Sequence, residues 1–422
     1  MAENAFVVSS IRTPFAKSMT AYRNISTFEL MSAVLKELVS KNKLVGQQVG
    51  EVVLGAVMNS SSNWNLAREC ALESGLSPYT PGYNVQKACG TSLEAAGQIA
   101  NKIRLGQIRV GIAGGVDTNS DAPIMVARKL AKKLLALNAA RSFGERLKLV
   151  ASFRPSDLVP QIPAVVEPRT GLSMGQHCEK MVQEWKISRI DQDTLALVSH
   201  QNGARAYEKG FFEDLVFEFM GNKKDLILRG DTTIEKLGKL KPAFEFSEKG
   251  TLTAGNSSPL TDGASAVLLA SESEAKKRGY NQLARFLDFQ SAAVDFVKGD
   301  GLLMAPTIAV AQLLERNNLK LQDFDFYEIH EAFTGQVLCT LKAWESDSYC
   351  KKFMNLPKAL GSIDRSKLNV NGGSVALGHP FAATGARIVG SLAKMLSQKG
   401  SGKGLISICT AGGMGVAAIL EA

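Results

Sequence analysis

The sequence contains the same local pattern twice. In each copy, a turn with a chemically reactive side chain opens a helix of small residues, and an apolar strand then ends in a glycine-rich turn. The first copy has Cys89 before its helix and ends in AGGVD at 113–117, and the second has His379 before its helix and ends in AGGMG at 411–415. A repeated supersecondary unit of this kind predicts two pseudo-equivalent α/β halves that bury a common core.

Apolar spacing predicts the individual elements of the two copies. Residues 93–105 have helical spacing, and Gly106 is a suitable stop. A second helix is expected over 382–396. Continuous apolar runs predict buried strands at 51–58, 110–113, 267–270, 324–329 and 405–409.

A segment of different composition separates the two copies. Residues 126–150 hold seven basic residues and one acidic residue, and Leu130, Leu134 and Leu137 share one helical face. Four prolines follow, at positions 155, 160, 163 and 168. We therefore predict a helical, loop-rich inserted domain. The predicted boundaries are an N-terminal half over 1–122 and 250–282, the inserted domain over 123–249, and a C-terminal half over 283–422.

The composition is that of an ordinary globular chain, with 45% hydrophobic and 21% charged residues in 422. We find no apolar run of about 18 residues, which a membrane-spanning helix would need. No charged leader precedes the apolar segment 5–8, which favours a cytoplasmic protein. The net charge of +9 favours anionic partners. The basic run 126–150 holds a single aromatic residue, Phe143, so we expect no nucleic-acid binding.

The six cysteines are scattered through the chain without a CxxC pair. This spacing predicts neither a disulfide framework nor a metal site. Only four histidines are present, at positions 177, 200, 330 and 379, so each one was considered as a functional residue.

Four segments carry candidate catalytic residues. Cys89 (KACGTSLEAA) opens a helix, where unpaired N–H groups and the helix dipole favour a thiolate. His379 (ALGHPFAATG) lies between a glycine and a proline, and His330 (EIHEAF) follows a predicted strand, where open α/β sheets place their sites. Cys409 (SICTAGGMG) ends a strand among small residues that leave room for a ligand. Taken singly, each residue also fits a structural role, as a buried cysteine or a hydrogen-bonded histidine.

Taken together, CGTSLEA, HEAF, GHPFAATG and CTAGGMG resemble, in this order, the four active-site loops of thiolases. RTPFAK at 12–17, KLKPAF at 239–244 and TLTAGNSSPLTDGASA at 251–266 also resemble thiolase segments, so the resemblance covers essentially the entire chain. It implies the thiolase fold, with two mixed α/β halves and an inserted helical loop domain. His330 in the HEAF loop and the CxxGG pattern at 409–413 are most similar to the β subunit of the fatty-acid-oxidation trifunctional enzyme and its bacterial relatives.

The resemblance also implies a role for each candidate residue. Cys89 would be the nucleophile, His379 its base and Cys409 a second acid and base. His379 and His330 would stabilise an enolate, and the backbone N–H groups of Cys89 and Ala411 would stabilise a tetrahedral oxyanion.

For coenzyme A, the resemblance implies contacts from Arg229, Ser258 and Met174. Two residues depart from the pattern, because Ala382 and Ala411 stand where many thiolases have glycine. Alanine keeps its N–H, so the oxyanion donor survives, while the shape of the acyl pocket can differ.

The resemblance implies CoA and acyl-CoA as substrates and no permanently bound cofactor. It also implies a homodimer or larger assembly. The basic segment 126–150 is either a solvated helix face or a docking surface for a hydratase/dehydrogenase α subunit or an anionic membrane. The expected activity is cleavage of 3-ketoacyl-CoA in β-oxidation.

Three alternatives are kept. A biosynthetic acetoacetyl-CoA thiolase would use the same residues. A ketoacyl synthase has no need for Cys409 as a second acid and base, and a non-catalytic subunit that only binds acyl-CoA would not need the set of Cys89, His379 and Cys409.

Overall fold

A computed structural model of the protein describes residues 3–161, 163 and 165–422. Within these residues ten strands form one sheet, in the order β4-β3-β5-β6-β1-β7-β10-β9-β8, and β2 pairs with β6. The strands are β1 (Ala5–Arg12), β2 (Ala16–Lys17), β3 (Glu51–Leu54), β4 (Gly82–Asn84), β5 (Val110–Asp117), β6 (Thr261–Ser271), β7 (Ala284–Ala293), β8 (Phe326–Ile329), β9 (Lys403–Thr410) and β10 (Met414–Glu421).

The two halves of the sheet share one pairing scheme. In the N-terminal half, β3 is parallel to β5, β5 is antiparallel to β6 and β6 is antiparallel to β1. In the C-terminal half, β8 is parallel to β9, β9 is antiparallel to β10 and β10 is antiparallel to β7. The halves join where β1 pairs with β7. The predicted arrangement of two pseudo-equivalent mixed α/β halves is therefore confirmed.

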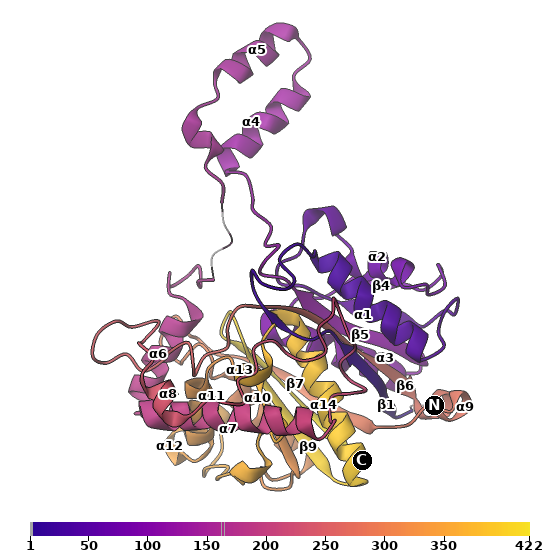
Figure 1. Ribbon diagram of the computed structural model, residues 1–422, viewed down its shortest axis with the longest axis vertical. Coiled ribbons are helices and arrows are strands. Elements are labelled where there is room, and N and C mark those ends of the chain that lie inside the picture. The colour runs from indigo at the N-terminus through magenta and orange to yellow at the C-terminus, as the bar shows by residue number, and fades with distance from the viewer. Residues whose placement is uncertain (1–2, 162, 164) are drawn as a thin grey trace. The chain divides into compact units, whose positions relative to one another are not determined.

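Helices cover both faces of the sheet, with a helix from each half on each face (Figure 1). On one face, α3 (Thr91–Arg104) and α14 (Thr384–Lys399) pack against each other and share one apolar core with the strands. On the other face, α1 (Thr27–Lys41) covers the N-terminal half and α10 (Ala305–Asn317) the C-terminal half. Adjacent strand residues alternate between these cores, since Leu269 faces α3 and α14 while neighbouring residues face α1.

The remaining helices of this main body surround the sheet. They are α2 (Leu66–Glu73), α6 (Met174–Glu184), α7 (Arg189–Glu208), α8 (Ile234–Gly238), α9 (Glu272–Arg278), α11 (Thr334–Trp344), α12 (Asp347–Met354) and α13 (Ser374–Leu377). Among the residues that the structure describes, no helix is long and apolar enough to cross a membrane.

Two glycines allow the central helices to approach their neighbours. A Cβ at Gly385, in the first turn of α14, would collide with the backbone nitrogen of Leu93 in α3. A Cβ at Gly115 in β5 would collide with the carbonyl of Ala382, just before α14. Because neither position carries a side chain, the segment before α14 lies directly against β5 and α3.

In the sequence, the insertion connects two strands that are neighbours in the sheet, since β5 ends at Asp117 and β6 begins at Thr261. The described residues between 122 and 166 form a compact unit of their own, with α4 (Arg128–Ala139) and α5 (Phe143–Ala151), while residues 167–422 group with residues 3–121. Helices α6, α7 and α8 therefore belong to the main body. The boundaries 123–249, 250–282 and 283–422 given above stay predictions.

Candidate active site

Cys89 lies in a single 3₁₀ turn, Ala88–Gly90, that leads directly into α3. Ala88 has a left-handed backbone with φ of 43°, which is strained for a residue other than glycine. The hydroxyl of Thr91 stabilises this turn, since it donates to the Ala88 carbonyl at 2.7 Å and accepts from the N–H of Lys87 at 2.8 Å. The turn holds Cys89 partly exposed at the start of the helix.

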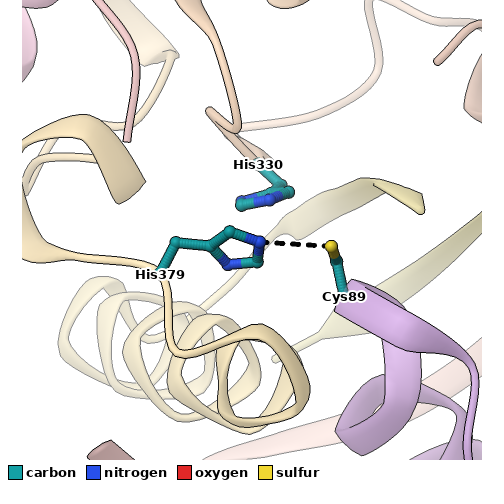
Figure 2. A group of neighbouring side chains, drawn as sticks. All are labelled: Cys89, His330 and His379. Carbon is teal, nitrogen blue, oxygen red and sulfur yellow. Dashed lines mark hydrogen bonds between the residues drawn. The ribbon is translucent and has the colours of Figure 1, made fainter. Parts of the chain in front are cut away.

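His379 comes from the equivalent position of the other half and meets Cys89. Its Nε2 lies 3.1 Å from the Cys89 sulfur, and its Nδ1 lies 2.6 Å from the hydroxyl of Thr384, the first residue of α14 (Figure 2). Its backbone N–H donates to the Thr261 hydroxyl at 3.1 Å. Gly378 has φ of 104°, a backbone that favours glycine, so the turn before the histidine depends on that residue.

His330 follows β8 and lies beside His379. The two ring centroids are 4.1 Å apart with planes tilted by 51°, and His330 is 1% exposed. Its Nδ1 pairs with the Ser374 hydroxyl at 2.8 Å, and that hydroxyl also accepts from Arg387 at 2.7 Å. Its Nε2 is buried, and no atom in the described part of the chain forms a hydrogen bond with it. One ligand-type atom from each of Cys89, His330 and His379 lies within 4.8 Å of the others.

Cys409 and Ala411 belong to the β9–β10 hairpin, which reaches the same site. Cys409 is 1% exposed, and burial together with the nearby Cys89 raises the pKa of its thiol well above the ordinary value. The backbone N–H groups of Ala411 and of Cys89 itself partly offset the rise in the Cys89 pKa.

Known proteins place this arrangement in one family. The family model described as "Thiolase, N-terminal domain" matches residues 5–273, and "Thiolase, C-terminal domain" matches residues 280–422. The chain belongs to the thiolase family. The resemblance and the fold predicted from the sequence are thereby confirmed, and the protein is an acyltransferase.

Curated relatives match this thiolase over nearly its whole length. A 3-ketoacyl-CoA thiolase from Yersinia enterocolitica is 41% identical over 421 residues, covering 98% of this chain and 96% of the relative. A 3-ketoacyl-CoA thiolase from Shewanella baltica is 40% identical over 427 residues, covering 99% and 97%.

Solved structures agree with the fold. The acetyl-CoA acetyltransferase of Bacillus anthracis superposes with a TM-score of 0.81 at 32% identity, covering 100% of this chain and 99% of that one. A thiolase from Ascaris suum in complex with coenzyme A superposes with a TM-score of 0.80 at 28% identity, covering 99% and 100%.

The electrostatics of the thiolase site favour a neutral resting pair. Burial, with the nearby Asp117 carboxylate, raises the pKa of Cys89 to about 12. Burial, with the Arg387 charge, lowers the pKa of His379 to about 3. Both shifts disfavour the charged forms and therefore favour a thiol beside a neutral imidazole over an ion pair.

Asp117 is a supporting residue that the sequence analysis did not single out. It is fully buried at the end of β5, and it accepts N–H groups from Met58 at 2.7 Å, Ala382 at 2.8 Å and Val57 at 3.1 Å. It thereby ties the chain after β3 to the segment between His379 and α14. Burial is the main reason that the pKa of Asp117 rises to about 7. The sequence did offer a signal for Asp117, because it is the acidic residue that ends the AGGVD motif.

Glu331, the acidic residue of HEAF, is also a buried carboxylate that joins two segments of the site, here the His330 loop and the segment before His379. It accepts from Asn369 at 2.6 Å, from Ser199 at 2.7 Å and from the N–H of Val375 at 3.2 Å. A Cβ at Gly373 would collide with the Glu331 carboxylate. The His330 loop and the segment before His379 are therefore fixed to each other through this carboxylate.

The three residues expected to contact CoA lie in different surroundings. Arg229 lines a cavity of about 110 Å³ together with Lys17, His200, Ser257 and Pro259. Ser258 stands between two lining residues and donates to the Ala332 carbonyl at 3.0 Å. Met174 instead packs on the apolar cluster that contains Cys409.

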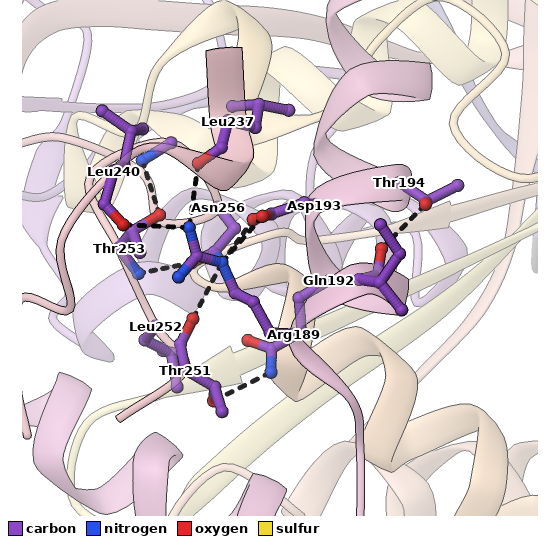
Figure 3. Close-up of polar contacts among 12 residues, drawn as sticks. Arg189, Gln192, Asp193, Thr194, Leu237, Leu240, Thr251, Leu252, Thr253 and Asn256 are labelled. Carbon is purple, nitrogen blue, oxygen red and sulfur yellow. Dashed lines mark hydrogen bonds and ion pairs between the residues drawn. The ribbon is translucent and has the colours of Figure 1, made fainter. Parts of the chain in front are cut away.

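The loop before Ser258 is fixed by polar contacts with α7 (Figure 3). Asp193 accepts from Arg189 at 2.7 Å and from Asn256 at 2.9 Å, and Gln192 donates to Thr251 at 3.0 Å. Arg189 also donates to the carbonyl groups of Leu237 and Leu240. Isolated β-bridges then join this loop to both histidine segments, Ser257 with Phe333 and Leu260 with His379. The cavity wall and the catalytic loops thus form one hydrogen-bonded unit.

Proposed function

We propose that this thiolase is a 3-ketoacyl-CoA thiolase of fatty-acid β-oxidation. It would cleave 3-ketoacyl-CoA with CoA into acetyl-CoA and an acyl-CoA shortened by two carbons. The observation that carries the proposal is the 3.1 Å contact between Cys89 and His379 beside Cys409, in a chain 41% identical to curated 3-ketoacyl-CoA thiolases.

In the first step, the Cys89 sulfur attacks the 3-keto carbon as its proton passes to His379 Nε2. For this, Nδ1 of His379 carries a proton and donates to Thr384, which leaves the Nε2 lone pair facing the sulfur. The pair is neutral at rest, so proton transfer accompanies attack. The new oxyanion accepts the N–H groups of Cys89 and Ala411, and losing one such donor typically costs about 2.7–4 kcal/mol of barrier.

In the second step, the bond between C2 and C3 breaks and leaves an acyl group on Cys89 and the enolate of acetyl-CoA. The Ser374 hydroxyl accepts from Arg387, so its own proton is free to go to His330 Nδ1. Nε2 of His330 then carries a proton with no partner, ready to donate to the enolate oxygen. Cys409 gives its thiol proton to C2, and acetyl-CoA leaves.

In the third step, the Cys409 thiolate takes the proton of an incoming CoA thiol. The CoA sulfur attacks the acyl-Cys89 carbonyl, the same two N–H groups stabilise the oxyanion, and the Cys89 sulfur leaves with the proton held by His379. Every residue then returns to its starting protonation state.

CoA would lie with its pantetheine arm along Ser258 and its nucleotide end at Arg229. The partly buried cavity that Arg229 lines supports this assignment, and a guanidinium suits a phosphate-adjacent position. Met174 would line the acyl-CoA path. Arg229→Gln should raise KM for CoA more than it lowers kcat. Equal falls in kcat and kcat/KM would instead assign Arg229 to the transition state.

The basic segment 126–150, which belongs to the separate unit, would be a docking surface. Its helices expose the apolar side chains of Leu135, Phe143 and Leu147, and seven basic residues lie between 126 and 150. Within the unit Lys133 pairs with Asp157 at 2.6 Å. We propose a hydratase/dehydrogenase α subunit or an anionic membrane as its partner, where each Lys or Arg contributes about 1 kcal/mol near a membrane.

Flotation of the full chain with phosphatidylserine vesicles tests the membrane contact. Binding should fall as salt rises and should be absent with neutral vesicles. No binding at low salt would remove the membrane and leave the α subunit as the proposed partner. A homodimer or larger assembly and a cytoplasmic location also stay predictions, and light scattering of the purified chain measures the first.

The test of the activity itself is cleavage of 3-ketoacyl-CoA by CoA over a range of chain lengths. Acetyl-CoA and the shortened acyl-CoA should form in equal amounts. Turnover confined to acetoacetyl-CoA would favour a biosynthetic acetoacetyl-CoA thiolase, and binding of acyl-CoA without turnover would favour a non-catalytic subunit.

A further inference from the structure

Three side chains of the active site are arranged as ligands of a metal ion. The Cys89 sulfur and one ring nitrogen each of His330 and His379 lie within 4.8 Å of one another (Figure 2). In tetrahedral zinc sites, sulfur and nitrogen lie about 2.3 Å and 2.0–2.1 Å from the metal, so neighbouring ligand atoms are separated by about 3.5 Å. The Cys89–His379 pair, at 3.1 Å, is already near this separation, so only His330 needs to approach.

An unpaired nitrogen is a second, independent sign of a ligand. His330 is 1% exposed, and its Nε2 has no hydrogen-bond partner among the residues that the structure describes. Since Nδ1 pairs with Ser374, Nε2 is the nitrogen left for a ligand. A buried polar atom without a partner is destabilising, and an occupant of the site would remove that destabilisation.

Both imidazoles form a hydrogen bond through Nδ1, as metal-binding histidines do through the ring nitrogen that does not bind the metal. His379 Nδ1 pairs with the Thr384 hydroxyl and His330 Nδ1 with the Ser374 hydroxyl, so each Nε2 is oriented toward the cluster. Arg387 fixes Ser374 in turn. The cluster contains no carboxylate, and sulfur with imidazole selects zinc and similar soft ions over magnesium or calcium.

We propose that the substrate-free site binds a thiophilic divalent ion, Zn²⁺ being the best fit, through Cys89, His330 and His379, and that the bound ion inhibits the enzyme. Binding releases the Cys89 thiol proton to solvent and forms the metal–sulfur bond. The His330 proton moves from Nε2 to Nδ1, where the Ser374 hydroxyl accepts it. Cys89 is partly exposed, which gives the ion an entry path and leaves a fourth position open to water or to the CoA thiol. The ion is a competitor of the substrate and takes no part in turnover.

Cobalt titration of the reduced, full-length chain tests the site without relying on any reaction. Co²⁺ should give a cobalt–thiolate charge-transfer band and the bands of tetrahedral cobalt, saturating at a single ion per chain, and Zn²⁺ should abolish them. Cys89→Ser should lose the thiolate band, and so should wild-type enzyme alkylated at Cys89, which has folded before the change. Ser374→Ala should weaken the metal affinity about 10–100-fold.

Two matched controls separate the site from other cysteines and histidines. Cys70→Ser and His177→Ala change buried side chains that bond to Ser32 and Thr170 respectively, outside the cluster, and should keep the cobalt spectrum. Absence of the thiolate band in wild-type enzyme, or its persistence after alkylation of Cys89, would overturn the site.

Inhibition is measured separately. Zn²⁺ added before the substrates should suppress thiolysis, a chelator should restore it, and Mg²⁺ at the same concentration should have no effect. Full turnover by the zinc-loaded enzyme would contradict inhibition. Because the cobalt spectrum needs no substrate, failure of the proposed thiolase activity would leave the metal site standing, and the reverse also holds.

Discussion

The N-terminal segments of α3 and α14 have the same construction and carry different chemistry. Each helix follows a 3₁₀ turn, Ala88–Gly90 or Phe381–Ala383, and each begins with a threonine. In the N-terminal half, Thr91 holds the backbone before the helix and Cys89 stays partly exposed. In the C-terminal half, Thr384 holds the imidazole of a 4% exposed His379. A duplicated scaffold thus positions Cys89, the proposed nucleophile, through its backbone and His379, the proposed base, through its side chain.

In the proposed mechanism, no other residue can replace Cys89 as the nucleophile. Cys89→Ala should lower kcat by about 10⁴-fold or more, because the residues act as a unit and no other group can form the acyl-enzyme. Turnover of 3-ketoacyl-CoA measures this, with Cys70→Ser as the matched cysteine control. A Cys89→Ala enzyme with near wild-type kcat would remove Cys89 from the mechanism.

Loss of the base should cost less. His379→Ala should lower kcat about 10²–10⁴-fold, the usual contribution of a positioned proton acceptor. The acyl-enzyme should accumulate more slowly in a rapid-mixing experiment. His177→Ala, a histidine outside the site, serves as the control. Equal rates of acylation in wild type and His379→Ala would assign the proton to another acceptor.

The carboxylate of Asp117, which joins the two segments, should matter mainly through geometry. Asp117→Asn replaces one acceptor oxygen by an NH₂ group. The single remaining oxygen of the asparagine cannot accept the N–H groups of Met58, Val57 and Ala382 together. A displacement of about 1 Å in a catalytic segment can cost about 100-fold in rate, and kcat should fall by that order. Asp121→Asn, an exposed aspartate, should leave kcat unchanged.

The pH dependence of alkylation reveals the resting charge state of the pair. Cys89 is an acid whose pKa is raised to about 12, so it is protonated from pH 6 to 9 and its thiolate fraction should grow about tenfold per pH unit. The rate of iodoacetamide modification at Cys89 should rise accordingly. A rate independent of pH over this range would indicate a thiolate–imidazolium pair instead.

The smallest effect concerns the threonine that holds the base. Thr384→Val leaves a buried Nδ1–H of His379 without an acceptor, and kcat should fall about tenfold, equivalent to about 1.4 kcal/mol of barrier. Thr384→Ser keeps the hydroxyl and should restore most of the rate. If the serine variant were as slow as the valine variant, packing rather than the hydrogen bond would be responsible.

Much of the fold was predictable because its signals are local. The expected helix at 93–105 is α3 (Thr91–Arg104), and the expected strand at 405–409 is β9 (Lys403–Thr410). The expected strand at 51–58 ends earlier, at Leu54. There the next residues turn so that the N–H groups of Val57 and Met58 reach Asp117. A hydrogen bond between residues about 60 positions apart produces no periodic pattern in the sequence from which it could be predicted.

The supporting residues could not be predicted for the same reason. Thr384, Ser374 and Arg387 look like ordinary helix or loop residues until their partners are known. The sequence analysis expected no metal site because the cysteines and histidines lack ligand spacing. The proposed zinc ligands come instead from three separate loops that only the fold brings together.

The sequence by itself determined the repeated α/β plan and the family. Apolar periodicity, the glycine-rich turns and each of the four ordered motifs involve only residues close together in the sequence. Only the tertiary structure decided which groups meet: the 3.1 Å contact of Cys89 with His379, the unpaired nitrogen of His330 and the three donors on Asp117. These depend on how two halves pack across one sheet. Packing of that kind joins residues distant in the chain, and burial then sets the protonation of the groups that it encloses.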